Sequence, residues 1–358
     1  MALLAATAGM AAAAGNAADT GDVAITERAE LVMGTVARLA VFDRAVAPAA
    51  FAAAFAALRA VDASMSLYIP GSELVRVNAH AAQHPEPVGL ELFTLLTRAR
   101  ALSEETDGAF DITVLPLLRL WGAYPGLGYL GRGNRSAVGF AGLQLDPAAR
   151  TVSFRRPGMA LDLGGIAKGF GLDRAAAALH AAGVGAARLD LGGNLALLGA
   201  GPRGVWRVAV RDPDVPEEPL GILALGSDVA VSTSGNYARD FAAEGWRAPS
   251  HIYDPRSGRP VLAPRAVTVW ASDATTADAL STALVVVGSQ GAASVLAREP
   301  RAGALVVEGS GPTRRIDVQG EPPLAWDAAA PGSMRGSAGG RPDRVRAAGS
   351  GSQHTRGG

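Results

Sequence analysis

A glycine-rich stretch over residues 161–172 places a carboxylate, Asp162, and an amine, Lys168, around a Gly-Gly turn. Lys168 is the single lysine of the chain, and the other 32 of its 33 basic side chains are arginine. A compact ammonium suits a point contact with phosphate, whereas a guanidinium is a larger and more rigid fork. The stretch therefore indicates a phosphate contact. Glycine-rich turns are weak motifs, and a strand-to-helix turn with a solvated lysine is the alternative.

A candidate metal site lies on a helix that the composition predicts over residues 275–287. Asp278 and Thr282 are four residues apart, so they share one face of that helix, and Ser281 adds a hydroxyl beside them. Mg²⁺ takes oxygen ligands and usually combines one or two carboxylates with phosphate and water. The spacing fits such a site, although the same side chains could cap the helix or line a core.

His251 is the candidate general base among the five histidines of the chain. It stands just ahead of a turn sequence over residues 254–258, a place that exposes an imidazole to a cleft. As a base it would need a substrate proton within hydrogen-bond reach. The alternative is a turn histidine bonded to the local backbone. Serine-hydrolase and standard nucleotide-binding motifs are absent from the sequence.

Composition narrows the function classes further. A chain of 358 residues can bury one large core or two smaller ones. Its 45 glycines and 5% aromatic content indicate a close-packed protein with many tight turns. The formal net charge of zero argues against a nucleic-acid surface. Because the chain has no cysteine, disulfides, thiolate metal sites and cysteine nucleophiles are excluded.

The two ends of the chain differ from its middle. Residues 1–18 are apolar and alanine-rich, which is typical of a secretory signal with an incomplete basic start, so a signal-like leader is expected over residues 1–22; a leader without function is the alternative. Residues 331–358 are rich in Gly, Ser and Arg, cannot bury a core and are predicted to be disordered. The folded domain is therefore expected over residues 23–330. We expect no membrane span beyond the N-terminal stretch.

The elements that position these residues follow from periodicity. The first predicted helix is amphipathic, with Phe51, Phe55, Leu58 and Val61 on one face, so these side chains are expected in the core. We expect helices over residues 48–64, 90–106, 172–182 and 275–287. Strands are expected in residues 24–42 and near 143–145, 151–154, 159–163, 187–191, 206–210, 220–225, 228–232, 267–271, 304–307 and 315–318. Residues 117–142 are predicted as a long loop, and such loops are more often functional than idle.

Eight motifs, taken together and in order, resemble the ApbE family of FAD:protein FMN transferases. Each motif alone is weak, but their common order and spacing over roughly residues 30–310 is specific. They are Met33-Gly-Thr35, Ser66-Leu-Tyr68 with Ser72-Glu-Leu and Asn78, Thr106-Asp-Gly-Ala-Phe-Asp111, Leu161-Asp-Leu-Gly-Gly-Ile-Ala-Lys-Gly169, Leu191-Gly-Gly-Asn194, Val231-Ser-Thr-Ser-Gly235, His251-Ile-Tyr-Asp-Pro-Arg-Ser-Gly258 and Ala277-Asp-Ala-Leu-Ser-Thr-Ala283.

The resemblance implies an α+β fold of the family's T-fold-like type, a two-lobed α/β sandwich with antiparallel or mixed sheets. It also implies a Mg²⁺-dependent enzyme that binds FAD as its substrate and splits the pyrophosphate. FMN would then be attached to a Ser or Thr hydroxyl of an acceptor flavoprotein, and AMP would leave.

By motif position, the resemblance also assigns roles to individual residues. It makes His251 the base that activates the acceptor hydroxyl. FAD contacts are implied for Met33, Tyr68, Ala109, Phe110, Asp111, Asp162, Lys168 and the backbone around Ile252. Metal contacts are implied for Gly165, through its carbonyl, and for Asp278 and Ser281 or Thr282.

Two other functions are alternatives to the transferase. A FAD pyrophosphatase would need the same metal and pyrophosphate contacts, with water as the nucleophile. A non-catalytic flavin-binding protein would have no use for a base and a metal. Exported members of the family flavinylate membrane-associated redox proteins, so a redox-complex subunit is the expected kind of acceptor. With the signal-like start, this favours a periplasmic or otherwise exported protein.

Overall fold

The computed structural model describes residues 25–43, 46–128, 131, 133–236, 250–328 and 346–347. The predicted leader over residues 1–22 lies outside the described residues. So does the predicted tail over residues 331–358, apart from residues 346–347.

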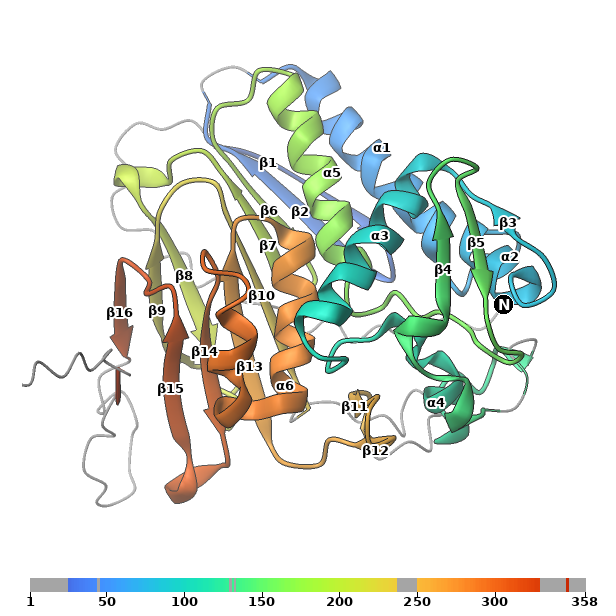
Figure 1. The fold of residues 1–358 in the computed structure, drawn as a ribbon. Coiled ribbons are helices and arrows are strands. Elements are labelled where there is room, and N and C mark those ends of the chain that lie inside the picture. The colour runs from blue at the N-terminus through green and yellow to red at the C-terminus, as the bar shows by residue number, and fades with distance from the viewer. Residues whose placement is uncertain are drawn as a thin grey trace, which may run out of the picture.

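A nine-stranded sheet runs through the described part of the molecule, and its neighbouring strands are antiparallel except for the last pair (Figure 1). In spatial order the strands are β1 (Thr26–Val32), β2 (Thr35–Val41), β6 (Ala187–Leu191), β7 (Asn194–Leu198), β10 (Val229–Gly235), β13 (Arg265–Ala271), β14 (Gly303–Glu308), β15 (Arg315–Gly320) and β17 (Arg346–Ala347).

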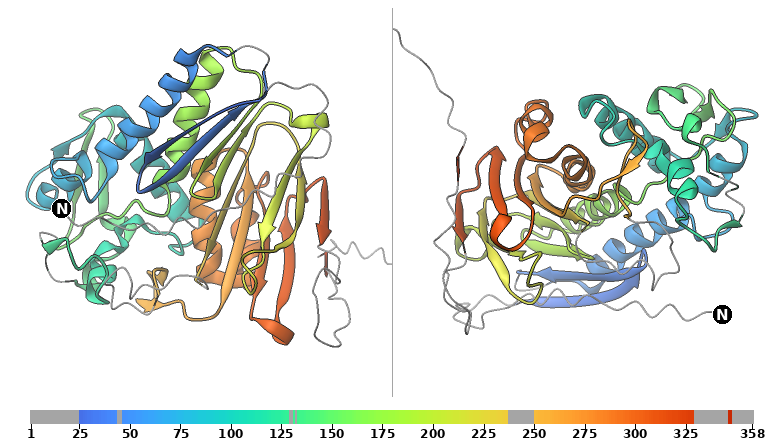
Figure 2. Two further views of the ribbon diagram at one scale, coloured as in Figure 1. Left: turned by 180° about the vertical axis from the view of Figure 1, so that it is seen from behind. Right: turned by 90° about the horizontal axis from the view of Figure 1, so that it is seen from below.

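Alternation along the strands gives this sheet two buried faces, because successive side chains of a strand point to opposite sides. In β13, Val267 and Val269 pack into the helical core, whereas Ala266 and Trp270 pack into a second hydrophobic cluster. The elements on the two faces follow this division (Figure 2). Helices α1 (Pro48–Met65), α5 (Ala167–Ala181) and α6 (Ala274–Leu296) cover the first face, and a sheet of β8 (Trp206–Arg211), β9 (Pro219–Leu225) and β16 (Ala325–Ala328) covers the other.

A second lobe lies beside these helices (Figure 1). It consists of helices α2 (Glu73–His80), α3 (Leu90–Glu105) and α4 (Leu115–Leu120) and a small antiparallel sheet of β3 (Glu86–Pro87), β5 (Thr151–Phe154) and β4 (Leu143–Asp146). Helix α3 packs against α6 and α1 and joins the lobes. A short hairpin of β11 (Tyr253–Asp254) and β12 (Arg259–Pro260) follows residue 250. The α+β class and the antiparallel and mixed sheets predicted from the sequence are confirmed.

The predicted start of the third helix was wrong. Helix α5 begins at Ala167 rather than near Gly171, so Lys168 lies in its first turn. The sequence predicted a glycine-rich turn before this helix, but Gly169 serves a close helix contact instead. A Cβ built on Gly169 would lie 2.1 Å from the carbonyl oxygen of Ala274 at the start of α6. Glycine is therefore needed here for close approach rather than for chain reversal.

The expected strand over residues 159–163 was also wrong, because this segment pairs with no strand among the described residues. A side chain supplies its hydrogen bonds instead. Asn78 accepts from the Leu161 N–H at 2.7 Å and donates to the Leu161 carbonyl at 3.0 Å. The Asp162 N–H donates to the carbonyl of Ile112 at 2.8 Å. These three hydrogen bonds hold the segment in place without a partner strand.

Two further differences concern element boundaries. The predicted loop over residues 117–142 begins inside α4, and its described residues include short 3₁₀ helices over Arg135–Ala137 and Phe140–Gly142. Helix α6 is longer than expected and is interrupted at Gly288, where φ is 68°. Within the described residues, α6 is the one helix that is long and apolar enough to cross a membrane by length and composition. It packs instead against α5, α3 and the sheet.

Candidate active site

Helices α5 and α6 cap each other's N-termini, and this places the charged residues of the site. Asp173 on α5 accepts from the N–H groups of Ala274 and Thr275 at 2.8 and 2.9 Å. In return, Asp278 on α6 accepts from the Gly169 N–H at 2.9 Å. Carboxylates at helix N-termini satisfy unpaired donors and the positive end of the helix dipole. The two helices are therefore locked in register at the point where Lys168 and Asp278 meet.

Asp278 has one carboxylate oxygen committed to Gly169 and the other directed toward Lys168. The residue is only 2% exposed. Its Oδ1 lies 3.8 Å from the Lys168 Nζ, which also donates to the carbonyl of Gly164 at 3.4 Å. A buried carboxylate next to one ammonium and a helix N-terminus can hold a cation and phosphate oxygens together.

The residues around Asp278 fit a hard cation. Thr282 is half-buried on the next turn of α6, and its Oγ1 lies 3.4 Å from the Asp278 carbonyl oxygen. Gly165 backs onto it, since a Cβ on Gly165 would lie 3.1 Å from that Oγ1. The described residues hold no cluster of three or more His, Cys, Asp or Glu suited to a metal. One carboxylate with hydroxyl and carbonyl oxygens is instead the donor set with which Mg²⁺ combines substrate phosphates and water.

Ser281, the other predicted metal ligand, belongs to a buried network behind Asp278. It is fully buried and donates to the Asp278 carbonyl at 2.8 Å. Its hydroxyl lies 3.2 Å from that of Ser232 and 2.7 Å from that of Ser234, both on β10. Ser232 in turn donates to Asn194 at 3.0 Å. Of the two predicted hydroxyls, only Thr282 is half-buried and adjacent to Gly165, so Thr282 is the better candidate for a metal ligand.

Asp162 lies on the other wall of the site. Its two carboxylate oxygens accept from the Gly164 N–H and from the Tyr124 hydroxyl, each at 2.6 Å. Burial raises the pKa of Asp162, while these two hydrogen bonds and the charge of Lys168 act in the opposite direction. Tyr124 was not identified from the sequence. The available signal was its position in the long segment predicted to be functional.

The residues predicted at 109–111 are brought to the same turn but play unequal parts. Phe110 lies against Gly165, with a ring carbon 3.4 Å from where a Cβ would stand. Ala109 is buried beside it. Asp111 is committed to the fold, because it accepts from the N–H and hydroxyl of Thr113 and from the N–H of Phe140. Burial raises the pKa of Asp111 against these bonds. Its side chain therefore joins two loops of the site.

Met33 and Tyr68 are the two predicted FAD contacts that come from the first hundred residues of the chain. Met33 occupies the β1–β2 turn with φ of 52°, and its N–H donates to Asp62 at 3.1 Å. Its sulfur packs against α5, 3.3 Å from the Cβ position of Gly171. Tyr68 is 62% exposed, and its ring stands edge-to-face to that of Tyr124, with the centroids 6.0 Å apart. An exposed aromatic edge of this kind can receive a flat ring.

His251 and Ile252 follow the segment 237–249, which lies outside the described residues. His251 is half-buried at the start of the hairpin loop. Ile252 is buried, its N–H donates to the Ser250 hydroxyl at 3.1 Å, and its carbonyl accepts from the Val261 N–H at 2.9 Å. The backbone at Ile252 is thus held by two hydrogen bonds, and these fix the position of the adjacent His251.

The known proteins that this chain resembles point to one family. The model of the ApbE family matches residues 33–306. The chain belongs to the ApbE family. Among curated proteins, it is 35% identical over 240 residues to the FAD:protein FMN transferase of Vibrio cholerae, covering 65% of this chain and 72% of that protein. It is 33% identical over 312 residues to that of Treponema pallidum, covering 78% and 83%.

Solved structures show the same family fold. The ApbE protein of Thermotoga maritima superposes with a TM-score of 0.70 at 31% identity, covering 82% of this chain and 97% of that one. The flavin transferase ApbE of Vibrio cholerae gives a TM-score of 0.69 at 29% identity, covering 83% and 97%. Every predicted site residue of this ApbE-family chain lies within the matched range of 33–306.

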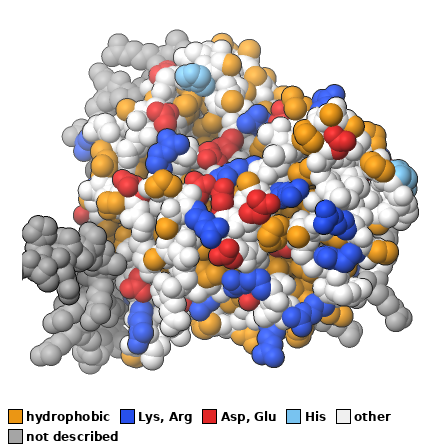
Figure 3. Space-filling view, viewed as in Figure 1, with side chains coloured by type: hydrophobic (Ala, Val, Ile, Leu, Met, Phe, Trp, Pro, Cys, Tyr) orange, Lys and Arg blue, Asp and Glu red, His pale blue; other side chains and the backbone are white. Residues whose placement is uncertain are grey.

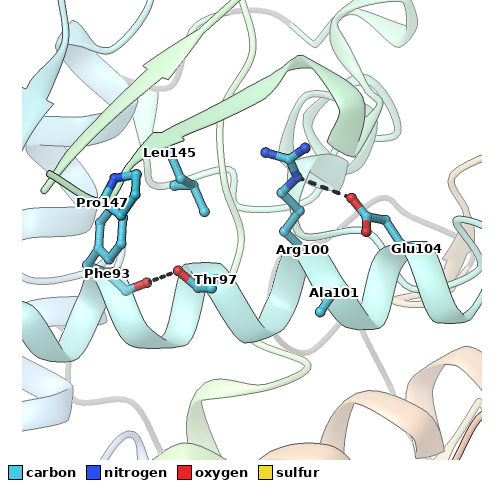
Figure 4. A pocket seen from close by; sticks show the side chains of 7 residues that line it. All are labelled: Phe93, Thr97, Arg100, Ala101, Glu104, Leu145 and Pro147. Carbon is cyan, nitrogen blue, oxygen red and sulfur yellow. Dashed lines mark hydrogen bonds and ion pairs between the residues drawn. The ribbon is translucent and has the colours of Figure 1, made fainter.

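The outer surface of this ApbE-family protein also has a pocket. A pocket of about 380 Å³ lies between α3 and β4 (Figure 4). Its polar groups pair locally: Thr97 donates to the Phe93 carbonyl at 2.8 Å, and Arg100 to Glu104 at 3.3 Å. It contains none of the predicted site residues. Acidic and basic side chains are intermingled across this face of the molecule (Figure 3).

Proposed function

We propose that the protein is a Mg²⁺-dependent FAD:protein FMN transferase. It would cleave the FAD pyrophosphate, attach FMN by a phosphoester to a Ser or Thr hydroxyl of an acceptor flavoprotein, and release AMP. The observation that carries the proposal is the meeting of Asp278, Thr282 and Gly165 with Lys168 at the N-terminus of α5. The curated relatives named FAD:protein FMN transferase support it.

Charge neutralisation is the main demand of this reaction, because phosphoryl-type transfer needs positioning more than covalent help from the protein. Asp278, Thr282 and the Gly165 carbonyl would hold Mg²⁺, which supplies a Lewis acid when bound. Lys168 offers a second positive charge 3.8 Å from the Asp278 carboxylate. The first turn of α5 adds the positive end of a helix dipole. Together these groups suit the two negative phosphates of FAD.

The acceptor hydroxyl needs a base, since it is far too weak an acid to ionise alone. We assign this role to His251. The hydroxyl oxygen forms a bond to the phosphorus on the riboflavin side, and the bond from that phosphorus to the bridging oxygen breaks. AMP leaves with the bridging oxygen, and the hydroxyl proton passes to His251.

The flavin and adenine portions would lie against the groups that surround this centre. Tyr68 offers an exposed aromatic edge, Met33 packs against α5, and Phe110 lies beside Gly165. Asp162 offers a buried acceptor for an N–H or O–H group of FAD. The acceptor is expected to be a redox-complex subunit outside the cytoplasm. Subcellular fractionation of the native host would test whether this protein is located there.

Incubation of the purified chain with FAD, MgCl₂ and an acceptor domain tests the activity. We expect the acceptor mass to rise by one FMN less water, with an equal amount of AMP by chromatography. AMP without a mass gain on the acceptor would instead indicate a FAD pyrophosphatase. FAD binding with neither product would indicate a flavin-binding protein.

A further inference from the structure

Tyr124 is held in an unusual backbone conformation four residues after the end of α4. Its φ is 54°, in the left-handed region that disfavours residues with a Cβ. Its carbonyl accepts from the Leu127 N–H at 3.1 Å and from the Arg119 guanidinium. The same guanidinium donates to the carbonyl of Ala123 at 3.0 Å. Such conformations persist where the surroundings over-determine them, and they concentrate at functional sites.

The side chain of Tyr124 joins three parts of the site. Its hydroxyl donates to Asp162 Oδ2 at 2.6 Å, the length of a strong hydrogen bond to a carboxylate. Its ring meets that of Tyr68 edge-to-face at 61°. It also packs against the apolar cluster that contains Tyr253. One residue thus connects the exposed aromatic rim to the buried carboxylate.

We propose that Tyr124 is a positioning residue for FAD. It holds the Asp162 carboxylate in the orientation that meets FAD and, through the bond from Gly164 to Asp162, fixes the turn that carries Gly165. This inference rests on the proposed function, because it takes Asp162 as a FAD contact. It adds a residue that acts through Asp162 rather than on the reacting atoms.

The opposite arrangement would be a gate, in which Tyr124 occupies the position of FAD and must leave before FAD binds. The geometry favours positioning. Arg119 and Leu127 anchor the backbone of Tyr124 independently of Asp162. A carboxylate oxygen can also accept more than one hydrogen bond, so the Tyr124 hydroxyl leaves Asp162 able to accept from FAD. To act as a gate, Tyr124 would have to break these backbone hydrogen bonds, and FAD binding does not require that.

Equilibrium binding of FAD in the presence of MgCl₂, followed by flavin fluorescence, tests the proposal without any acceptor. Tyr124→Phe removes only the hydroxyl, and we expect about tenfold weaker FAD binding. Tyr253→Phe is the matched control. It removes a buried hydroxyl from the same cluster that has no hydrogen-bond partner in the described structure, and we expect binding within about twofold of wild type.

A double-mutant cycle separates positioning from a general packing defect. If Tyr124 acts through Asp162, Tyr124→Phe should cost little further affinity in a chain that already carries Asp162→Asn. Tighter or unchanged FAD binding by Tyr124→Phe would overturn the proposal, as would full additivity with Asp162→Asn. A wild type that binds no FAD would overturn the proposed function as well, so the two failures are distinguishable.

Discussion

Replacement of Gly169 by alanine tests whether the contact between α5 and α6 builds the site. A Cβ at this position would lie 2.1 Å from the Ala274 carbonyl oxygen and 2.9 Å from the Asp278 Cβ. Real Cβ atoms do not approach so closely, so the helices must separate. Overpacking costs about 1–3 kcal/mol. Loss of the charge-assisted bond from the Gly169 N–H to Asp278 costs a further 1.5–3 kcal/mol or so.

Helix propensity offsets part of this cost, because alanine is favoured over glycine inside a helix by about 1 kcal/mol. The net expectation is a loss of roughly 2–5 kcal/mol in the free energy of unfolding, measured by urea denaturation. Gly171→Ala is the control on the same helix. Its Cβ would meet side-chain atoms alone, those of Leu58, Met33 and Val61, at 3.2, 3.3 and 3.9 Å. Flexible ends can shift, so we expect a change within about 1 kcal/mol.

The variant should also lose Mg²⁺-dependent binding of FAD, because Asp278 would move away from Lys168. Isothermal titration of FAD with and without MgCl₂ measures this at a temperature where the variant is folded. A Gly169→Ala protein that is as stable as Gly171→Ala, and binds FAD as wild type does, would refute the argument from close approach.

Three further outcomes follow from the site. Asp278→Ala should abolish turnover and Mg²⁺-dependent FAD binding, and AMP release at the wild-type rate would refute the metal assignment. His251→Ala should keep FAD bound but slow transfer to the acceptor by about 10²–10⁴-fold in single-turnover assays, whereas lost binding would make it a structural residue. Burial raises the pKa of Asp173, so the folded chain binds this proton more readily than the unfolded chain and gains stability as the pH falls. The unfolding free energy of wild type minus that of Asp173→Asn should therefore grow between pH 7 and 4.5 in urea titrations; a constant difference would contradict the shift.

Those features of the structure that depend on nearby residues could be predicted from the sequence. The apolar spacing of Phe51, Phe55, Leu58 and Val61 predicted the buried face of α1, and all four are buried there. Such repeats work because each side chain packs against the same layer. The residue types at Asp162, Lys168 and Asp278 indicated phosphate and metal chemistry before any geometry was known.

What the sequence did not reveal depends on partners far along the chain. Gly169 and Asp278 are separated by 109 residues, and the need for glycine appears only when α6 is in place. Asn78 acts in place of a neighbouring strand for Leu161, which no strand propensity records. Tyr124 lies in irregular structure without periodicity, so nothing local marks its bond to Asp162. The glycine-rich stretch over residues 161–172 suggested a turn, because local sequence rules consider only the conformational freedom of glycine.

The position of Lys168 has a practical consequence. Its side chain is 31% exposed in the first turn of α5, and it is the sole ε-amine of the chain. An amine-selective acylating reagent therefore has one side-chain target, apart from the α-amino group, and that target lies at the proposed phosphate-binding end of the site. Peptide mapping by mass spectrometry separates an adduct on Lys168 from one on the α-amino group, so the yield at Lys168 reports whether this position is covered. If FAD binds as proposed, protection of Lys168 from acylation measures its occupancy and needs neither an acceptor nor an engineered label.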